Sequence, residues 1–495
     1  MATSTRALIA LGIAIASLAV RAPTLDRALT IDEKLWIERS DRFIGAVGDL
    51  RFRDAIETGH PGVTTMWVAG LAQRTLPAGA DLRERYERAR LGMGIAATGL
   101  VVLIWWLAGL IFGGAVGALG GFLLALDPFL VAHGRVVHLD GLLALLMVAS
   151  VLALMAALRD DDRRMLLLSG ALGGLSLLTK QPAVYLILVA AVLLWRDGEG
   201  IRARLLRWLI PAAVVVFVLW PVLWVRPWHA AGQMLGGGGA AVTETTSSGF
   251  FLGRQVDDPG PLFYPVALAL RSSELILPAA IGAIVWAVRR RREDPGRSAV
   301  RLLLFALGFL ALMSIAPKKG DRYGLPSLVA VDLVVAVALW QLFRSKARVV
   351  VGSALAAMLL LHAAPALWLH PYELAHFNLV TGGASVAQRA VVVGWGEGLD
   401  EAAEELSRMP GASGMTVATT RVTQFEDFFI GRTIRVEDSS LARPGGTPAD
   451  LVLFYISSVQ TGRVPQIWAR YRDRAPVYRL DINGIPYVRV YRVTD

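Results

Sequence analysis

The sequence has no cysteine among its 495 residues. It can therefore form no disulfide, no thiolate metal site and no thiol nucleophile. Any chemistry must come from carboxylate, histidine, lysine, arginine or hydroxyl groups. Charged residues are also scarce, at 18% of the chain against 55% hydrophobic residues. A soluble protein of this length is less apolar, so the composition predicts a membrane protein.

Long apolar runs are the main feature of the chain. Many of them can cross about 30 Å of hydrocarbon as a helix, and the alternating pattern of barrel strands is absent. We therefore expect an all-α polytopic membrane bundle with about eleven transmembrane helices. The expected spans are 6–24, 90–110, 112–128, 139–158, 165–179, 182–195, 206–225, 262–288, 300–316, 325–343 and 349–369.

Basic residues gather in four short loops, at 159–164, 196–207, 289–294 and 344–348, and the net charge is +10. The positive-inside rule makes these loops cytoplasmic, so this charge indicates orientation and we expect no nucleic-acid partner. We expect a multi-pass protein of the inner or plasma membrane. Its N-terminus is then cytoplasmic, its first apolar run is a retained anchor, and its C-terminal tail is extracytoplasmic.

Two domains are expected, because the long apolar runs end near residue 370 and shorter helical and strand-like patterns follow. Residues 1–369 form the transmembrane domain, with a first exterior loop at 25–89 and a flexible exterior loop at 227–261 that closes over a ligand. Residues 370–495 form a small α/β extracytoplasmic domain, because a helical segment is followed by two apolar strand-like runs and a hairpin pattern turning at Asn483-Gly484.

Two adjacent carboxylates, Asp32 and Glu33, follow the first apolar run in "LTIDEKLWIERS". An acid at the membrane surface is a general base when it lies within hydrogen-bond reach of an acceptor hydroxyl. We expect Asp32 to abstract the proton and Glu33 to orient the acceptor. The alternative is a pair of solvated loop charges.

Further polar residues fall on the same predicted face. His60 lies in a turn before an apolar segment, and Arg135, His138 and Asp140 precede a membrane helix. Glu244 lies in the expected flexible loop. We expect His60, His138, Asp140 and Glu244 to contact substrate, with Asp140 or Glu244 as the base if Asp32 is not. The alternatives are a structural histidine, a helix cap and a salt bridge.

Cations on this face indicate an anionic ligand. Lys180 interrupts an apolar run, and "KKGDRY" places Lys319, Arg322 and Tyr323 at the outer end of a helix, against the usual charge bias. Together with Arg135 we expect them to bind a phosphate, most simply a lipid phosphate. The alternatives are a lysine that snorkels to the surface and a solvated charge run. A sugar on a lipid phosphate already has a good leaving group, so one base and several cations suffice for its transfer.

At these residues the chain resembles a family. The order of "DE", "HP" and "R-x-x-x-L-D" is similar to protein O-mannosyltransferases, and "K-x-x-R-Y-x-x-P" at 319–326 is similar to the transferases of lipid A aminoarabinose. Both belong to the GT-C class, which uses polyprenyl-phosphate sugars. "GHPGVTTMW", "DPGPLFYPVAL" and "GWGEGLDEAA" resemble its bacterial phospholipid-carrier-dependent branch.

The resemblance implies a GT-C-like fold and roles for five residues. It places Asp32 on the base, Glu33 on the companion acid, His60 on the histidine of "HPP", and Arg135 and Asp140 on a pair in the second exterior loop. Gly62 stands where the family usually has a second proline, and the Glu-Lys before proline of the aminoarabinose enzymes is missing. The resemblance therefore leaves the sugar and the metal site of that subfamily open.

The sequence thus predicts an integral-membrane glycosyltransferase that moves a hexosyl or pentosyl group from a polyprenyl phosphate to a protein, lipid or glycan acceptor by inverting displacement. Membrane lipids are the other expected partners. We assign no cofactor and no metal ligand, with a divalent metal as an open alternative. A transporter or flippase is the rival function, because Asp332 and the pair Arg271/Glu274 fall within apolar runs. A scaffolding role for the exterior domain is a third option.

Overall fold

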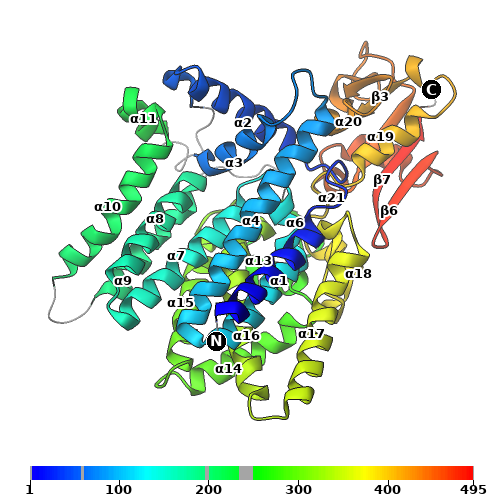
Figure 1. The fold of residues 1–495 in the computed structure, drawn as a ribbon. Coiled ribbons are helices and arrows are strands. Elements are labelled where there is room, and N and C mark those ends of the chain that lie inside the picture. Colours follow the sequence, from blue (N-terminus) through cyan, green and yellow to red (C-terminus); the bar gives the residue numbers. More distant parts are fainter. Residues whose placement is uncertain (1–2, 57–60, 196–199, 234–248, 494–495) are drawn as a thin grey trace.

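The computed structural model describes residues 3–56, 61–195, 200–233 and 249–493 of the chain. It is a helical bundle with a smaller mixed α/β domain packed at one end (Figure 1). This confirms the predicted membrane bundle with a C-terminal α/β region. The bundle helices are α1 (Thr3–Arg21), α4 (Leu82–Phe112), α5 (Gly114–Leu126), α6 (Pro128–Arg135), α7 (Asp140–Asp160), α8 (Arg163–Thr179), α9 (Tyr185–Leu194), α10 (Ile201–Leu219), α13 (Phe263–Arg271), α14 (Ile276–Arg289), α15 (Gly296–Ile315), α16 (Leu325–Phe343) and α17 (Arg348–Trp368).

The centre of the bundle is α7, which is buried along almost its whole length. Its sequence is apolar on every side, and such a helix is stable only when other helices surround it. It packs against α4, α8 and α16. Because α7 begins at Asp140, this packing fixes one end of the helix, and with it a carboxylate, inside the protein.

The number of membrane spans differs from the expected eleven. Within the described residues, six helices are long and apolar enough to cross a membrane, or up to eight when each sharply bent pair counts as one span. The bends lie between α5 and α6, at 64°, and between α13 and α14, at 119°. The expected run at 262–288 is therefore broken, while α8 and α9 have only 17 and 10 residues. The multi-pass membrane character is confirmed and the count of eleven is not.

The loops rich in arginine and the polar candidates lie at opposite ends of the same helices. Helix α7 starts at Asp140 and α8 ends beside Lys180, so the loop 159–164 between them lies about 30 Å away at a rise of 1.5 Å per residue. Helices α15 and α16 likewise flank the segment around Arg322, with their basic loops at the far ends. This separation agrees with the predicted sidedness, which stays a prediction.

The predicted first exterior loop is itself structured. It contains the amphipathic helix α2 (Glu33–Gly48), the short helix η1 (Phe52–Asp54) and α3 (Val63–Gln73), which packs on α2. Gly62 precedes α3 with φ +59°, and a Cβ there would overlap the ring of Trp36. Glycine thus suits this position better than the second proline of the family pattern.

The C-terminal domain is built on a five-stranded sheet of order β4-β3-β5-β7-β6. Strand β3 is parallel to β4 and β5, while β5, β7 and β6 are antiparallel. The predicted hairpin is confirmed, with Asn483 and Gly484 at φ +50° and +73° between β6 and β7. The strands are β3 (Thr416–Thr419), β4 (Arg432–Arg435), β5 (Leu451–Tyr455), β6 (Tyr478–Ile482) and β7 (Ile485–Arg492).

Short elements complete the two parts and connect them. One hydrophobic core contains Phe263 and Tyr264 of α13 as well as Val417, Tyr455 and other residues of the sheet domain. The domain is therefore packed onto the bundle through a shared core. The remaining elements are η2 (Gln181–Val184), α11 (Val222–Val225), β1 (Gly249–Phe251), β2 (Arg254–Val256), η3 (Asp321–Gly324), η4 (Glu373–Ala375), η5 (Leu379–Thr381), α18 (Gly383–Ala390), α19 (Leu399–Ser407), η6 (Ala412–Gly414), α20 (Val422–Phe425), η7 (Val436–Asp438), α21 (Ile456–Gln460) and α22 (Pro465–Tyr471).

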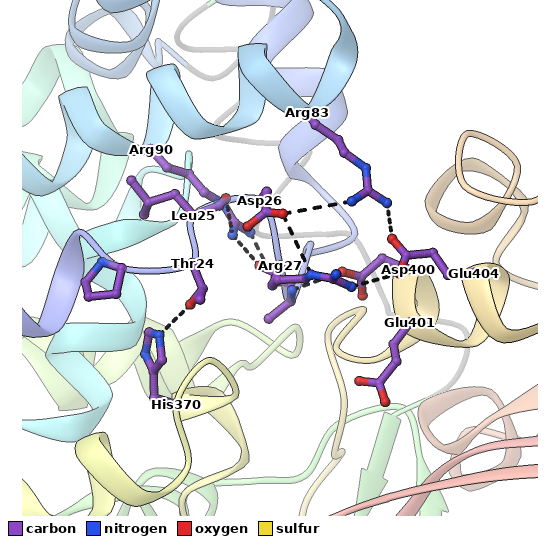
Figure 2. Close-up of polar contacts among 12 residues, drawn as sticks. Thr24, Leu25, Asp26, Arg27, Arg83, Arg90, His370, Asp400, Glu401 and Glu404 are labelled. Carbon is purple, nitrogen blue, oxygen red and sulfur yellow. Dashed lines mark hydrogen bonds and ion pairs between the residues drawn. The ribbon is translucent and has the colours of Figure 1, made fainter.

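A second junction joins the segment after α1 to helix α19 (Figure 2). Glu404 of α19 forms ion pairs with Arg27 and Arg83. Asp400, one turn earlier, accepts a hydrogen bond of 3.2 Å from the backbone N–H of Ala28. These contacts hold the chain that leads to Asp32 against the C-terminal domain.

Candidate active site

Asp32 lies where α2 begins, at the junction between the bundle and the C-terminal domain. Its side chain is 37% exposed, and its Oδ2 accepts a hydrogen bond of 3.2 Å from the indole of Trp395. The same oxygen lies 3.6 Å from Nε2 of His138 and 3.8 Å from the guanidinium of Arg322. The structure therefore brings the predicted base to an open position beside cationic and aromatic groups.

Asp140 holds the predicted cations together. It is buried at the start of α7, and its Oδ1 accepts a hydrogen bond of 2.6 Å from Lys180, at the end of α8. Its Oδ2 lies 3.1 Å from Nε of Arg322, which comes from η3, and 3.1 Å from Nδ1 of His138. Three segments that are far apart in sequence thus meet at one carboxylate. An acid paired with two cations attracts protons weakly, which argues against Asp140 as the alternative base.

Aromatic rings fix the orientation of these cations. Lys180 Nζ lies 4.3 Å from the centre of the Tyr323 ring, and the guanidinium of Arg322 lies 4.4 Å from that of Trp395. Such contacts stabilise a cation and limit its rotamers. Tyr323, expected to touch the phosphate, therefore also supports the lysine beside it.

Trp395 is a residue to which the sequence alone assigns no role. The motif that contains it, "GWGEGLDEAA", resembles the family but does not reveal which residue it would contact. In the structure its carbonyl accepts a hydrogen bond of 2.7 Å from the N–H of Ile31. Gly394 and Gly396 flank it with φ +89° and +124°, and a Cβ on Gly396 would lie 2.5 Å from the carbonyl of Leu29. The two glycines were the local signal of a tight turn that approaches another backbone.

A cavity of about 310 Å³ lies beside these residues, between the bundle and the C-terminal domain. Basic residues outnumber acids in its wall, where the carboxylates of Asp321 and Glu397 are the acidic ones. Asp321 accepts a hydrogen bond of 2.7 Å from Arg271. The cavity therefore has the charge expected for an anionic ligand. Its basic lining residues are Arg271, Lys318, Lys319, Arg322, Arg421 and Arg463.

Lys319 points to the carboxylate of Asp258 at a distance of 2.5 Å and to the carbonyl of Ala316 at 2.7 Å. The hydrogen bond from Lys319 lowers the pKa of the exposed Asp258 carboxyl. Asp258 belongs to the loop that follows the β1–β2 hairpin. Lys319 thus links the helix end to the loop above the cavity.

Glu33, although adjacent to Asp32, lies in a different environment. It is fully buried and forms an ion pair with Arg90 of α4. It also accepts hydrogen bonds of 2.9 Å from the N–H of Val137 and 2.8 Å from that of Thr30. Burial raises the pKa of Glu33, but the charge of Arg90 and these hydrogen bonds outweigh it, so the net pKa is lowered. Both carboxylate oxygens are thus engaged inside the protein.

Arg135 belongs to this second environment rather than to the cavity wall. Its guanidinium pairs with Glu373 at 2.7 Å and donates to the carbonyls of Pro23 and Thr24 at 2.6 and 2.9 Å. The residue is buried. These contacts tie the segment after α1 to η4, and they separate Arg135 from the other cations expected at the phosphate.

Two expected substrate contacts, His60 and Glu244, lie outside the described residues. His138 is brought to the site, between Asp32 and Asp140. In the part of the chain that the structure describes, no group of three His, Asp or Glu residues has metal-binding geometry.

The residues that favoured a transporter lie in two places. Arg271 pairs with Asp321, and Glu274 lies 3.2 Å from His376, so both belong to the junction with the C-terminal domain. Asp332 is buried within α16, and neither of its carboxylate oxygens has a hydrogen-bond partner in the described structure.

Comparison with known proteins finds one family-model match in the sequence. Residues 81–225 match the family model described as dolichyl-phosphate-mannose-protein mannosyltransferase. No curated protein sequence matches the chain. These matched residues contain Arg90, Arg135, His138, Asp140 and Lys180, but neither Asp32 nor Arg322.

Solved structures share the fold over nearly the whole chain. ArnT from Cupriavidus metallidurans, bound to undecaprenyl phosphate, has 15% identity and a TM-score of 0.56, covering 99% of this chain and 98% of its own. The oligosaccharyltransferase of Archaeoglobus fulgidus has 11% identity and a TM-score of 0.52, covering 93% of this chain and 71% of its own. In complex with an inhibitory peptide and a dolichol-phosphate, the archaeal AglB of that organism has 10% identity and a TM-score of 0.51, covering 93% of this chain and 72% of its own.

The fold match and the family match together support the predicted integral-membrane, lipid-phosphate-dependent glycosyltransferase. They confirm that the chain resembles the GT-C class, in fold over nearly all of its length and in sequence over residues 81–225.

Proposed function

We propose that this protein transfers a sugar from a polyprenyl phosphate to an acceptor hydroxyl at the junction of the bundle and the C-terminal domain. The observation that carries this proposal is the arrangement around Asp32. An exposed carboxylate lies beside Arg322, at the edge of a predominantly basic cavity. One base for the acceptor and cations for the leaving phosphate are the groups that the reaction needs.

Asp32 is the proposed general base. It accepts the proton of the acceptor hydroxyl while the acceptor oxygen forms a bond to the anomeric carbon. The bond from this carbon to the phosphate oxygen breaks in the same displacement, and the electron pair leaves with the lipid phosphate. A single displacement inverts the anomeric configuration and forms no sugar–enzyme bond. The indole of Trp395 and the imidazole of His138 orient the carboxylate.

Arg322, Lys180 and Lys319 are the proposed phosphate-binding cations. Their present partners, Asp140 and Asp258, hold them in place before the donor arrives. Preorganised cations stabilise the charge of the leaving phosphate without further reorganisation. Tyr323 supports Lys180 and Arg322 through its ring. Lys318 and Arg271 complete the basic wall on the membrane side.

Glu33 and Arg135 are proposed as positioning residues. Glu33 fixes the first turn of α2 through Thr30 and Arg90, and so fixes Asp32. Arg135 fixes the segment that precedes this turn. His60 and Glu244 remain candidates for contact with the acceptor.

We further propose the sidedness that the basic loops indicate. The active site and the C-terminal domain face the extracytoplasmic side of the inner or plasma membrane, and the N-terminus is cytoplasmic. A reporter fused after Asp495 should be accessible outside the cytoplasm, and one inserted within 289–294 should be cytoplasmic. The reverse result would place the site on the cytoplasmic side.

Purified protein in vesicles tests the function. Sugar release from a polyprenyl-phosphate donor that depends on an added acceptor would support the glycosyltransferase. Uptake or flipping of the lipid-linked sugar with its bond to phosphate intact would support a transporter instead. The variant Asp32→Asn is the matched control, since it should strongly reduce transfer and leave any flux unchanged.

A further inference from the structure

Two arginines of the C-terminal domain line the cavity without an acidic partner. Arg421 donates a hydrogen bond of 2.8 Å to the hydroxyl of Ser457, but its buried Nε has no partner in the described structure. Arg463 lines the same wall, and among the described residues neither arginine has a carboxylate within ion-pair distance. Other arginines of this domain do have acidic neighbours, such as Arg479 beside Asp481 at 2.8 Å.

The electrostatics of this wall favour an anion. Burial and the like charge of Arg463 both lower the pKa of Arg421, to about 10, so it still carries its charge at neutral pH. The buried acid nearby, Glu397, is already engaged by the N–H of Trp395 at 2.5 Å and the hydroxyl of Tyr455 at 2.9 Å. An arginine kept only for packing would be expected to have its donors satisfied.

The topology of the sheet places these groups where ligands commonly bind. The chain passes from β3 to β4 on one side, and then crosses to β5 on the other side of β3. The crevice at the carboxyl ends of parallel strands, where the connections diverge, is a general binding position. Arg421 follows β3 by two residues and Ser457 follows β5 by two residues. A hydrogen bond of 2.7 Å between Thr420 and Ser458 joins the same two strand ends.

This crevice faces the proposed catalytic base. Arg421 is close enough to Asp32 for the carboxylate to raise its pKa, although burial dominates. Ser457, Thr461 and Arg463 line the cavity on this side, while Arg322 and Lys319 line it on the membrane side. The cavity thus has basic residues from both parts of the protein, and Trp395, whose indole donates to Asp32, also lines it.

We propose that the crevice between β3 and β5 is an acceptor subsite, in which Arg421 and Arg463 bind an anionic group, phosphate or carboxylate, carried by the acceptor. The inference rests on the proposed function and adds the chemical class of the acceptor. The donor phosphate binds the membrane wall, the acceptor anion binds the domain wall, and the acceptor hydroxyl lies between them at Asp32.

The test uses the full chain purified in detergent, with the membrane wall first saturated by undecaprenyl phosphate. Inorganic phosphate and acetate are then titrated separately, and binding is followed by calorimetry. The wild-type protein should bind at least one of the two anions. The double variant Arg421→Gln/Arg463→Gln should weaken this binding at least tenfold, and Arg421→Lys by less because the charge remains.

Arg432→Gln is the matched control, since Arg432 lies at the amino end of β4, away from the crevice. It should leave anion binding unchanged. Equal anion binding in the double variant, or no binding to the lipid-saturated wild type, would overturn the subsite. Undecaprenyl phosphate binding by the double variant shows that it is folded. A wild-type protein that does not bind undecaprenyl phosphate would instead contradict the proposed function itself.

Discussion

Asp32 and Glu33 are neighbours in the chain, yet they lie in opposite environments. Asp32 is partly exposed beside the cavity-lining residues Trp395 and Arg322, and its Oδ2 has one hydrogen-bond donor, the indole of Trp395. Glu33 is fully buried and engaged by Arg90, Thr30 and Val137. The start of α2 separates the two side chains. Two adjacent acids can thus have different roles. One is available to accept a proton, and the other fixes the backbone that positions the first.

The strongest test of this comparison is Asp32→Asn. The amide keeps the shape and an acceptor for Trp395 but loses the basicity. Turnover should fall by roughly two to four decades, the range for loss of general base catalysis, while donor affinity is largely kept. Single-turnover transfer and donor binding would be measured separately. Glu38→Gln is the control, because Glu38 is an exposed acid of the same helix. Near-parental transfer by the Asp32 variant would remove the proposed base.

Glu33→Gln should affect stability more than chemistry. It leaves Arg90 as a buried charge without its acid, and breaking such a pair costs about 3–5 kcal/mol of unfolding free energy. Thermal denaturation in detergent should show a large loss, and the folded fraction should keep a higher turnover than the Asp32 variant. Adding Arg90→Gln should recover part of the stability. A stable Glu33→Gln protein with turnover as low as that of Asp32→Asn would make Glu33 a direct participant.

The basic residues also fall into two groups, those proposed to bind the donor phosphate and those that stabilise the fold. Arg322→Gln and Lys180→Gln should each weaken donor binding by about ten- to a hundredfold, because a charge-assisted hydrogen bond contributes about 1.5–3 kcal/mol. Arg135→Gln should leave the donor affinity of the folded protein unchanged and reduce its stability. Binding of undecaprenyl phosphate to the three variants distinguishes the two classes. A common loss of affinity would return Arg135 to the phosphate site.

A smaller effect is expected from Asp400, on the structural side of the comparison. Burial raises its pKa to about 6, against about 3.9 for an unfolded aspartate. Between these values the folded state holds a proton that the unfolded state has released. Protonation therefore stabilises the fold below about pH 4, and this contribution, at most about 3 kcal/mol, is lost as the pH rises through 6.

The variant Asp400→Asn isolates this contribution. The difference in melting temperature between it and the parent should be small at pH 4.5 and should grow to a few degrees in favour of the variant at pH 7.5. Other carboxyls of the junction, such as Glu404, have lowered pKa values and act in the opposite direction. The comparison must therefore be made as a difference between the two proteins. A difference that does not change with pH would contradict the raised pKa of Asp400.

The sequence predicted the helices well, because apolar runs are long and their periodicity is strong. The spans expected at 139–158 and 325–343 correspond closely to α7 and α16. The break in the run at 262–288 was not predicted, although the polar residues 271–274 interrupt its apolar pattern. Boundaries that depend on tertiary packing leave little local signal.

The candidate site could be predicted only in part. The residue types and their common face follow from charges at the ends of helices. The sequence does not show which of these charges contact one another, because Asp140, Lys180 and Arg322 come from three separate segments. Arg135 has the same sequence signal as Arg322, a cation at the outer end of a helix, and differs only in finding Glu373. Trp395 was missed because no local pattern shows an indole reaching a residue more than 360 positions away.

The turn at Gly396 has one more consequence. Its φ is +124°, and a Cβ at this position would lie only 2.5 Å from the Leu29 carbonyl, so no side chain fits there. Alanine at this position would push two backbones apart and carry Trp395 away from Asp32 without deleting a single functional group. Replacement of this one hydrogen would thus disturb the local contact between the two parts of the protein, and an intact set of catalytic residues would be left out of alignment.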